Sequence, residues 1–168
     1  MIETKRLILK PLTYEQLVKY LKADHSLETE FNLKKTVRTL YHQLKEAFEQ
    51  TILPNVADTN KNYLYSTLWT AIDTERNQMV GDICIVGEPN VNGEIEIGYS
   101  TYEEFRKAGY MTEAVGGMIE WARSQPEVSS IIASTEKDNI GSFTLLMKNN
   151  FIKIGETESL LHWKLNIK

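Results

Sequence analysis

The sequence has little of the chemistry that cross-links small secreted proteins or anchors proteins in membranes. Cys84 is the only cysteine among 168 residues, so an intrachain disulfide is excluded and Cys-x-x-Cys metal spacing is absent. No apolar run approaches the length that spans a bilayer, and Met1 to Arg6 lack the cationic start and apolar stretch of a secretory signal. We therefore expect a cytoplasmic protein with no bound metal and no membrane partner.

An excess of positive charge is also missing. The chain has 19 Lys and Arg residues against 23 Asp and Glu residues, a formal net charge of -4, and a pI near 5.5. This balance disfavours attraction to phosphate backbones, so we expect no nucleic-acid partner. The content of 42% hydrophobic and 25% charged residues is typical of a globular protein. A chain of this length buries roughly 70% of its unfolded surface, which favours a single domain over residues 1–168.

Hydrophobic periodicity predicts strands and helices that alternate in one α/β (α+β) domain. About seven strands are expected, at residues 4–12, 63–73, 79–87, 94–101, 128–134, 151–156 and 160–167. About four helices are expected, the first after Thr13 with Gln16 in a capping box, the others at residues 36–51, 112–124 and 140–148. Residues 54–62 are rich in turn formers and predict an exposed loop. The order β-α-α-β-β-β-α-β-α-β-β predicts a mixed central sheet flanked by helices.

The segment from Tyr102 to Ala114 leads from a strand through a turn with small residues into a helix. Successive backbone N–H groups in such a turn, together with the positive end of the helix dipole, bind a pyrophosphate. Gly109 allows a close approach of the backbone to the ligand. The alternative is an ordinary connection between a strand and a helix, which has the same residue pattern.

The same segment resembles the coenzyme A binding signature of GNAT-type N-acetyltransferases, and more narrowly their RimJ/RimL branch. The matching motif is Arg106-x-x-Gly109-x-Met111 followed by Thr112-Glu113-Ala114. Further segments are similar to the same branch: residues 4–9, residues 96–99, and Asn139-x-x-Ser142 ahead of Lys148-x-x-Phe151. The resemblance covers nearly the whole chain and implies the GNAT acyl-CoA N-acyltransferase fold.

The resemblance also implies acetyl-CoA as co-substrate. The residues expected to bind it are Ile97, Gly98, Tyr99, Arg106, Lys107, Ala108, Gly109, Tyr110, Met111, Thr112, Asn139, Ser142 and Lys148. Three positions depart from the family pattern. Met111 fills a small-residue position, and Asn150 replaces a glycine that precedes Phe151 but tolerates the same left-handed backbone. Leu146 stands where many members carry the tyrosine that protonates the departing thiolate, so that acid must come from elsewhere.

Acetyl transfer to an ammonium needs a base, donors for the oxyanion, and help for the leaving thiolate. Glu96 is the leading candidate for the base, and Glu94 lies on the same strand face, where like charge could raise a pKa. Alternatively, both glutamates simply form the solvated side of a strand. Backbone N–H groups from Ile97 to Tyr99 are the expected oxyanion donors. Ser142 is the candidate that assists the thiolate, although Asn139 and Ser142 also suit helix capping.

The resemblance therefore implies acetyl transfer to a primary amine by direct attack in a ternary complex. The acceptor could be a protein N-terminus, a free amino acid, a polyamine or an aminoglycoside, bound by residues 14–51 and the final hairpin. Two alternatives stay open: an acyl-CoA sensor or interaction module without turnover, and an unrelated small α/β binding domain. A homodimer through exposed apolar residues of the second expected helix or the last strand is also left open.

Overall fold

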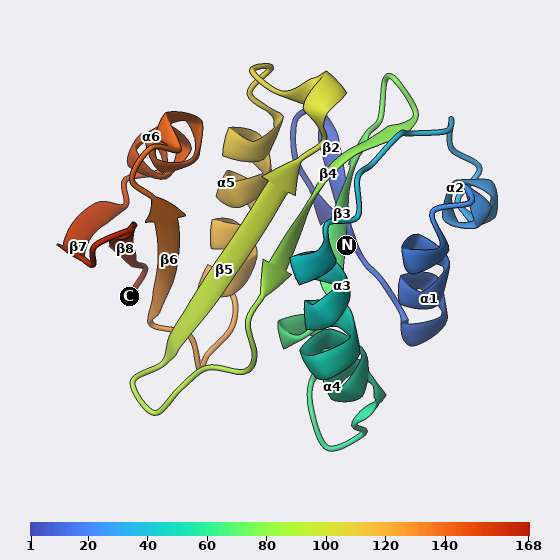
Figure 1. Cartoon of the computed structure of the whole chain (residues 1–168). Coiled ribbons are helices and arrows are strands. Elements are labelled where there is room, and N and C mark those ends of the chain that lie inside the picture. The colour runs from blue at the N-terminus through green and yellow to red at the C-terminus, as the bar shows by residue number, and fades with distance from the viewer.

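Eight strands form one mixed sheet in the order β1-β2-β3-β4-β5-β6-β8-β7 (Figure 1). The computed structural model describes residues 1–168. The strands are β1 (Ile2–Glu3), β2 (Leu7–Pro11), β3 (Leu68–Asp73), β4 (Gln78–Ile85), β5 (Glu94–Thr101), β6 (Ser130–Glu136), β7 (Ile152–Glu156) and β8 (Leu160–Asn166). The helices are α1 (Tyr14–Lys22), α2 (Ser26–Glu30), α3 (His42–Ala47), α4 (Leu53–Ala57), α5 (Tyr110–Arg123) and α6 (Ile140–Lys148). The predicted fold class is confirmed, and β1 is one strand more than expected.

The sheet divides in the middle. All neighbouring strands are antiparallel except β5 and β6, which pair in parallel only from Glu94 to Glu96, with Ser130 to Ile132. Beyond Glu96, β5 stays paired with β4 while β6 stays paired with β8. The two strands therefore diverge, as Figure 1 shows, and one edge of β5 is left without a strand partner.

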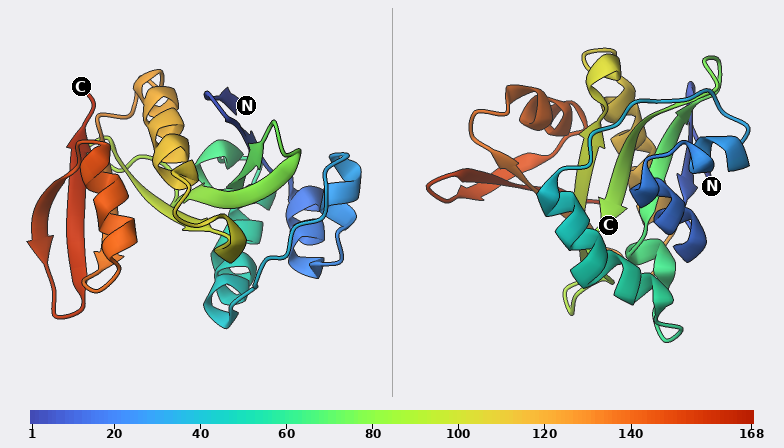
Figure 2. Two further views of the ribbon diagram at one scale, coloured as in Figure 1. Left: turned by 90° about the horizontal axis from the view of Figure 1, so that it is seen from above. Right: turned by 45° about the vertical axis from the view of Figure 1, so that its right-hand side comes forward.

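Helices cover the two faces of the sheet differently. Helix α5 packs on β1, β2, β4 and β5 on one face, and α6 lies beside it on the same face (Figure 2). Helix α1 and the consecutive helices α3 and α4 lie on the opposite face. Because side chains alternate along a strand, Ile97 and Tyr99 of β5 point toward α5 and α6, whereas Glu96, Gly98 and Ser100 point to the opposite face.

Local sequence signals account for the ends of α1 and α6. The predicted capping box is present: the Thr13 hydroxyl accepts from the Gln16 N–H, and the Gln16 side chain accepts from the Thr13 N–H. Asn139 caps α6 by accepting from the N–H of Ser142 at 3.1 Å. Asn150 follows α6 with a φ of 68°, the left-handed conformation expected of the residue that replaces glycine there.

Two predictions between residues 36 and 62 are wrong. The expected helix over 36–51 begins only at His42, since Thr36 is buried and donates its hydroxyl to the Met79 carbonyl, which holds residues 34–36 extended beside β4. The expected loop over 54–62 begins with a helix, because Pro54 occupies the first turn, where a missing N–H costs nothing. A π-helical turn, Phe48–Ile52, joins α3 to α4.

The ends of two other predicted elements also differ. Residues 63–65 form a three-ten turn instead of the start of a strand. Helix α5 begins at Tyr110, two residues before the predicted start, because Gly109 takes the left-handed conformation that lets the chain enter the helix there.

Candidate active site

A cleft of about 600 Å³ lies where β5 and β6 diverge, between the end of β5, the turn before α5, and α6. Most of the residues predicted to bind coenzyme A line it: Tyr99, Arg106, Lys107, Gly109, Tyr110, Met111, Thr112, Asn139, Ser142 and Lys148. Ile97, Gly98 and Ala108 do not line this cleft, and Ile97 is buried. Residues from distant parts of the sequence therefore meet around one opening.

The turn from Lys107 to Thr112 offers unpaired backbone donors. None of the N–H groups from Lys107 to Thr112 donates to a protein acceptor, and the first bond of α5 runs from the Glu113 N–H to the Gly109 carbonyl. Lys107 and Gly109 both adopt positive φ, 63° and 79°. Such a run of N–H groups at the start of a helix of 14 residues is a site for an anion.

The expected departure at Met111 does not crowd this turn. Its terminal carbon lies 3.0 Å from the position that a Cβ on Gly81 would occupy, so the side chain reaches under β4. The absence of a side chain at Gly81 makes room for it. Met111 is 5% exposed and contributes to the core.

Arg6 and Glu113 hold the turn from outside the cleft. The Arg6 Nε lies 2.7 Å from Glu113 Oε2, and Arg6 Nη1 donates to the Ala108 carbonyl at 2.9 Å. The Arg6 guanidinium also lies over the ring of Tyr110, 4.5 Å from its centre. Burial acts to raise the pKa of Glu113, but hydrogen bonds from Thr4 and Arg6 outweigh it and keep this pKa below its usual value. Sequence reasoning did not find this pair.

Positive charge gathers at the cleft despite the acidic chain. Arg106, Lys107 and Lys148 line it, and none of the three forms an ion pair with a protein carboxylate. Arg106 Nε donates only to the Thr101 carbonyl, at 3.3 Å. The charges are therefore available to an anionic ligand at the mouth of the cleft.

Tyr99 and Ser142 meet across the cleft. The Tyr99 hydroxyl lies 2.9 Å from Ser142 Oγ and donates to the Ser142 carbonyl at 3.2 Å. Asn139 is the residue that caps α6, so the capping alternative holds for Asn139, whereas the Ser142 hydroxyl contacts Tyr99 instead. Leu146 is completely buried and offers no polar group.

The two glutamates of β5 have different environments. Glu94 Oε2 accepts from Lys164 Nζ at 2.7 Å, and this hydrogen bond lowers the pKa of Glu94 below its usual value. The expectation that like charge raises a pKa is therefore wrong for Glu94. Glu96 lies two residues nearer the opening, is half-buried, and forms no hydrogen bond or ion pair through its carboxylate. Of the two, Glu96 is the one available to a substrate.

A second cavity, of about 330 Å³, opens on the other face of the sheet. It lies between residues 37–41, which precede α3, and the end of β5 with the turn that follows, residues 100–106. Glu103 and Glu104 line it and form no ion pairs. Ser100, Thr101 and Arg106 line both cavities, so the two spaces adjoin at the end of β5.

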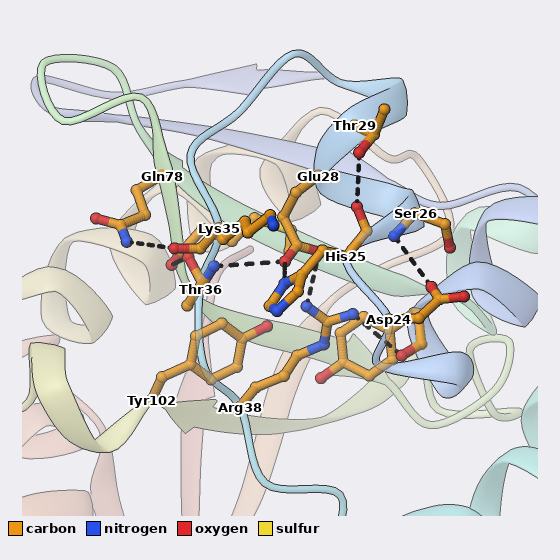
Figure 3. A network of polar contacts seen from close by, with 12 residues as sticks. Asp24, His25, Ser26, Glu28, Thr29, Lys35, Thr36, Arg38, Gln78 and Tyr102 are labelled. Carbon is orange, nitrogen blue, oxygen red and sulfur yellow. Dashed lines mark hydrogen bonds and ion pairs between the residues drawn. The ribbon is translucent and has the colours of Figure 1, made fainter.

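A buried polar network that the sequence did not reveal supports this second cavity. The Arg38 guanidinium donates to Glu28 Oε1 at 3.0 Å and to the Tyr20 carbonyl at 3.1 Å, and His25 Nδ1 lies 2.5 Å from Glu28 Oε2 (Figure 3). The side chains of Arg38 and Glu28 are 2% and 1% exposed. The network ties residues 37–41, which border the cavity, to α1 and α2.

Asp82 lies buried between α1 and the sheet. Its Oδ2 accepts from the hydroxyls of Tyr20 and Tyr102 at 2.6 and 2.7 Å, while Oδ1 has no partner. Burial raises the pKa of Asp82 to about 6, against the lowering effect of those two hydroxyls. Asp82 therefore changes its charge near pH 6. It lies next to the second cavity, because its partner Tyr102 lines that cavity.

Cys84 does not provide a nucleophile. It lies opposite Gly98 in the sheet, and burial raises the pKa of its thiol to about 11. A thiol with that pKa is almost entirely protonated at neutral pH, so it cannot attack an acyl group efficiently.

The fold and the cleft define a class of protein: an α/β domain whose sheet divides beside the unpaired N–H groups at the start of a helix. The chain belongs to the GNAT acetyltransferase family, because the model of the acetyltransferase (GNAT) domain matches residues 6–152. The family predicted from the sequence is therefore confirmed.

Individual relatives agree with this assignment. The uncharacterized N-acetyltransferase YjdG of Bacillus subtilis is 38% identical over 95 residues, which are 56% of this chain and 56% of YjdG. The ribosomal-protein-S5-alanine acetyltransferase of Vibrio fischeri has the same fold, with a TM-score of 0.71, 18% identity, and coverage of 99% of this chain and 96% of its own. RimL, a ribosomal L7/L12 α-N-protein acetyltransferase in complex with coenzyme A, gives a TM-score of 0.68 with 12% identity, over 97% and 95%.

No helix has the length and apolar character that crossing a membrane requires. No group of three or more His, Cys, Asp and Glu side chains is arranged to hold a metal ion.

Proposed function

We propose that the chain transfers an acetyl group from acetyl-CoA to a primary amine by direct attack. The observation that carries this proposal is the run of unpaired N–H groups from Lys107 to Thr112 at the start of α5, which faces the cleft. These groups suit the pyrophosphate of coenzyme A, and Arg106, Lys107 and Lys148 add positive charge around it.

The rest of the cofactor follows the open edge of β5. Past Glu96 this edge has no strand partner, so its backbone N–H and C=O groups are free to bind the amides of the pantetheine arm. The acetyl group then lies near Gly98, where N–H groups between Ile97 and Tyr99 stabilise the oxyanion. A side chain at Gly98 would crowd the neighbouring strand, because its Cβ would lie 3.3 Å from Cys84 Sγ.

Glu96 is proposed as the base that takes the proton from the acceptor ammonium, directly or through a water molecule. Its carboxylate is not engaged by another side chain, and it points to the face opposite α5 and α6. The acceptor therefore approaches from the face that carries the second cavity. The alternative in which Glu96 is only a solvated strand residue predicts no loss of turnover on substitution.

The second cavity is proposed to hold the body of the acceptor. Ser100 at its edge lies two residues from Gly98, a distance of about 7 Å along a strand. Glu103 and Glu104 offer two carboxylates without ion-pair partners to a cationic amine, and Arg38 and Arg106 also line the cavity. A protein N-terminus is one such acceptor, and the names of the RimL and Vibrio fischeri neighbours describe acetylation of ribosomal proteins. A free amino acid, a polyamine and an aminoglycoside are the other candidates.

Calorimetric titration with acetyl-CoA tests the cofactor site, with Gly109→Trp as the variant that blocks the turn. A substituent at Gly109 must adopt a φ of 79° and meets Arg6 Nη2 at 3.4 Å, so this variant distorts the turn. We expect micromolar binding to the natural chain and at least a tenfold loss in the variant. Absence of heat and of a thermal shift with the natural chain would contradict the proposal.

A second candidate function, an acyl-CoA sensor without turnover, is favoured by the buried Leu146 at the position of the usual acid. Release of free thiol from acetyl-CoA in the presence of an amine panel separates the two functions. Thiol release that falls at least a hundredfold in Glu96→Gln, with acetyl-CoA binding retained, supports the enzyme. Binding without any thiol release supports the sensor.

A further inference from the structure

The cleft contains a tyrosine hydroxyl close to α6, the helix in which Leu146 is buried. Tyr99 extends from β5 across the opening to the first turn of α6, and its hydroxyl lies 2.9 Å from Ser142 Oγ. Both residues line the cleft. A phenol is thus present in the cleft, and it comes from β5, whereas Leu146 belongs to α6.

We propose that Tyr99 positions the Ser142 hydroxyl toward the sulfur of coenzyme A, so that the two residues together replace the tyrosine missing at Leu146. The inference rests on the proposed function, because it assumes that acetyl-CoA occupies the cleft. It assigns to Tyr99 a role in turnover besides contact with the cofactor.

The hydrogen-bonding capacity of the pair fits this role. Each hydroxyl has one proton to donate. The Tyr99 proton has two acceptors on Ser142, Oγ at 2.9 Å and the carbonyl oxygen at 3.2 Å. When it is donated to the nearer Oγ, the Ser142 proton is free to point at the sulfur. The Ser142 N–H is already held by the Asn139 side chain, which fixes the backbone that carries this hydroxyl. The pair therefore presents one directed donor at the wall of the cleft.

The charge state of Tyr99 agrees with a donor. Burial raises the pKa of Tyr99, and the hydrogen bond with Ser142 lowers it by less. The phenol therefore keeps its proton at neutral pH. Because a thiol has a pKa of about 8.5, the phenol is the weaker acid, and it acts by hydrogen bonding while the sulfur leaves.

The bonds and protons of the reaction balance as follows. The ammonium loses one proton to Glu96, the nitrogen attacks the thioester carbon, and the nitrogen then loses a second proton. The C–S bond breaks, and the sulfur leaves with the electron pair as a thiolate that accepts a hydrogen bond from Ser142. The thiolate takes up one proton from solvent. One proton is released overall, and the products are the amide and free coenzyme A.

Steady-state kinetics of Tyr99→Phe, Ser142→Ala and the double variant test the inference. We expect kcat to fall about tenfold in Tyr99→Phe and about a hundredfold in Ser142→Ala, with acetyl-CoA affinity changed less than about threefold. The double variant should be no slower than Ser142→Ala alone, because Tyr99 acts through that hydroxyl. Ser142→Thr, which keeps a hydroxyl, should recover most of the rate.

Tyr63→Phe is the matched control. Tyr63 is 37% exposed, and its hydroxyl forms no hydrogen bond. The kcat of Tyr63→Phe should equal that of the natural chain. A Tyr99→Phe variant with unchanged kcat, or a double variant whose loss is the product of the single losses, overturns the inference. A natural chain that neither binds acetyl-CoA nor releases thiol refutes the proposed function instead.

Discussion

Arg6 Nε lies 2.7 Å from Glu113 Oε2, although 107 positions separate the two residues in the chain. The pair joins the start of β2 to the first turn of α5, and Arg6 also donates to the Ala108 carbonyl in the turn before α5. The shape of the turn therefore depends on a residue far from it in sequence.

Replacing Arg6 with alanine should weaken acetyl-CoA binding by about fivefold, close to 1 kcal/mol, because the turn loses its outer support while its own residues remain. The pair is partly exposed, with side chains 39% and 18% accessible, so a larger effect is not expected. Calorimetry with acetyl-CoA measures the change.

Arg123→Ala is the control for this prediction, since Arg123 forms a comparable ion pair with Glu120 at the other end of α5. It should leave the affinity unchanged. Equal losses in both variants would show that α5 as a whole, and not the Arg6 contact, sets the affinity.

Asp82 should make stability depend on pH in an unusual direction. Its pKa is raised to about 6, so between about pH 4 and 6 the folded chain holds a proton that the unfolded chain has already lost. Stability from this group is therefore present at low pH and is lost as the pH rises through 6. Urea unfolding from pH 4 to 7 should show Asp82→Asn gaining about 2 to 3 kcal/mol relative to the natural chain.

The difference between the two unfolding curves isolates Asp82, because the other titrating groups are common to both proteins. Asp138→Asn, at an exposed turn position where the carboxylate forms no hydrogen bond or ion pair, should give a flat difference. A flat difference for Asp82→Asn as well would mean that Asp82 stays ionised throughout this range.

Removal of Arg38 should destabilise the fold strongly. Arg38→Met leaves Glu28 buried without its cation, and such a loss costs about 3 to 5 kcal/mol. The pKa of Glu28 is kept below its usual value because hydrogen bonds from His25 and Arg38 outweigh the effect of burial. The double variant Arg38→Met with Glu28→Gln should be more stable than Arg38→Met alone, as measured by urea unfolding. A double variant that is less stable would show that Glu28 acts independently of Arg38.

The sequence was sufficient to predict those parts of the structure that depend on neighbouring residues in the chain. The turn from Arg106 to Thr112 and the cap at Asn139 are short segments whose backbone geometry follows from their own residues, and the structure brings them into one cleft. The resemblance to the family motif supplied the further expectation that these two segments bind the same ligand.

Tertiary contacts decided what the sequence could not show. Residues 36–41 have apolar residues at helical spacing, but the buried hydroxyl of Thr36 bonds to Met79 and keeps the start of this segment extended. The contact of Tyr99 with Ser142 joins residues 43 positions apart. Neither pairing leaves a periodic signal, since each depends on how strands and helices are placed in space.

The divergence of β5 and β6 after Glu96 leaves a row of unsatisfied backbone groups in the middle of the molecule. A row of that kind is the usual starting point for strand exchange and aggregation. A bound cofactor arm would satisfy these groups and separate the exposed edge from other chains. As more of the protein binds the cofactor, self-association through this edge should therefore decrease.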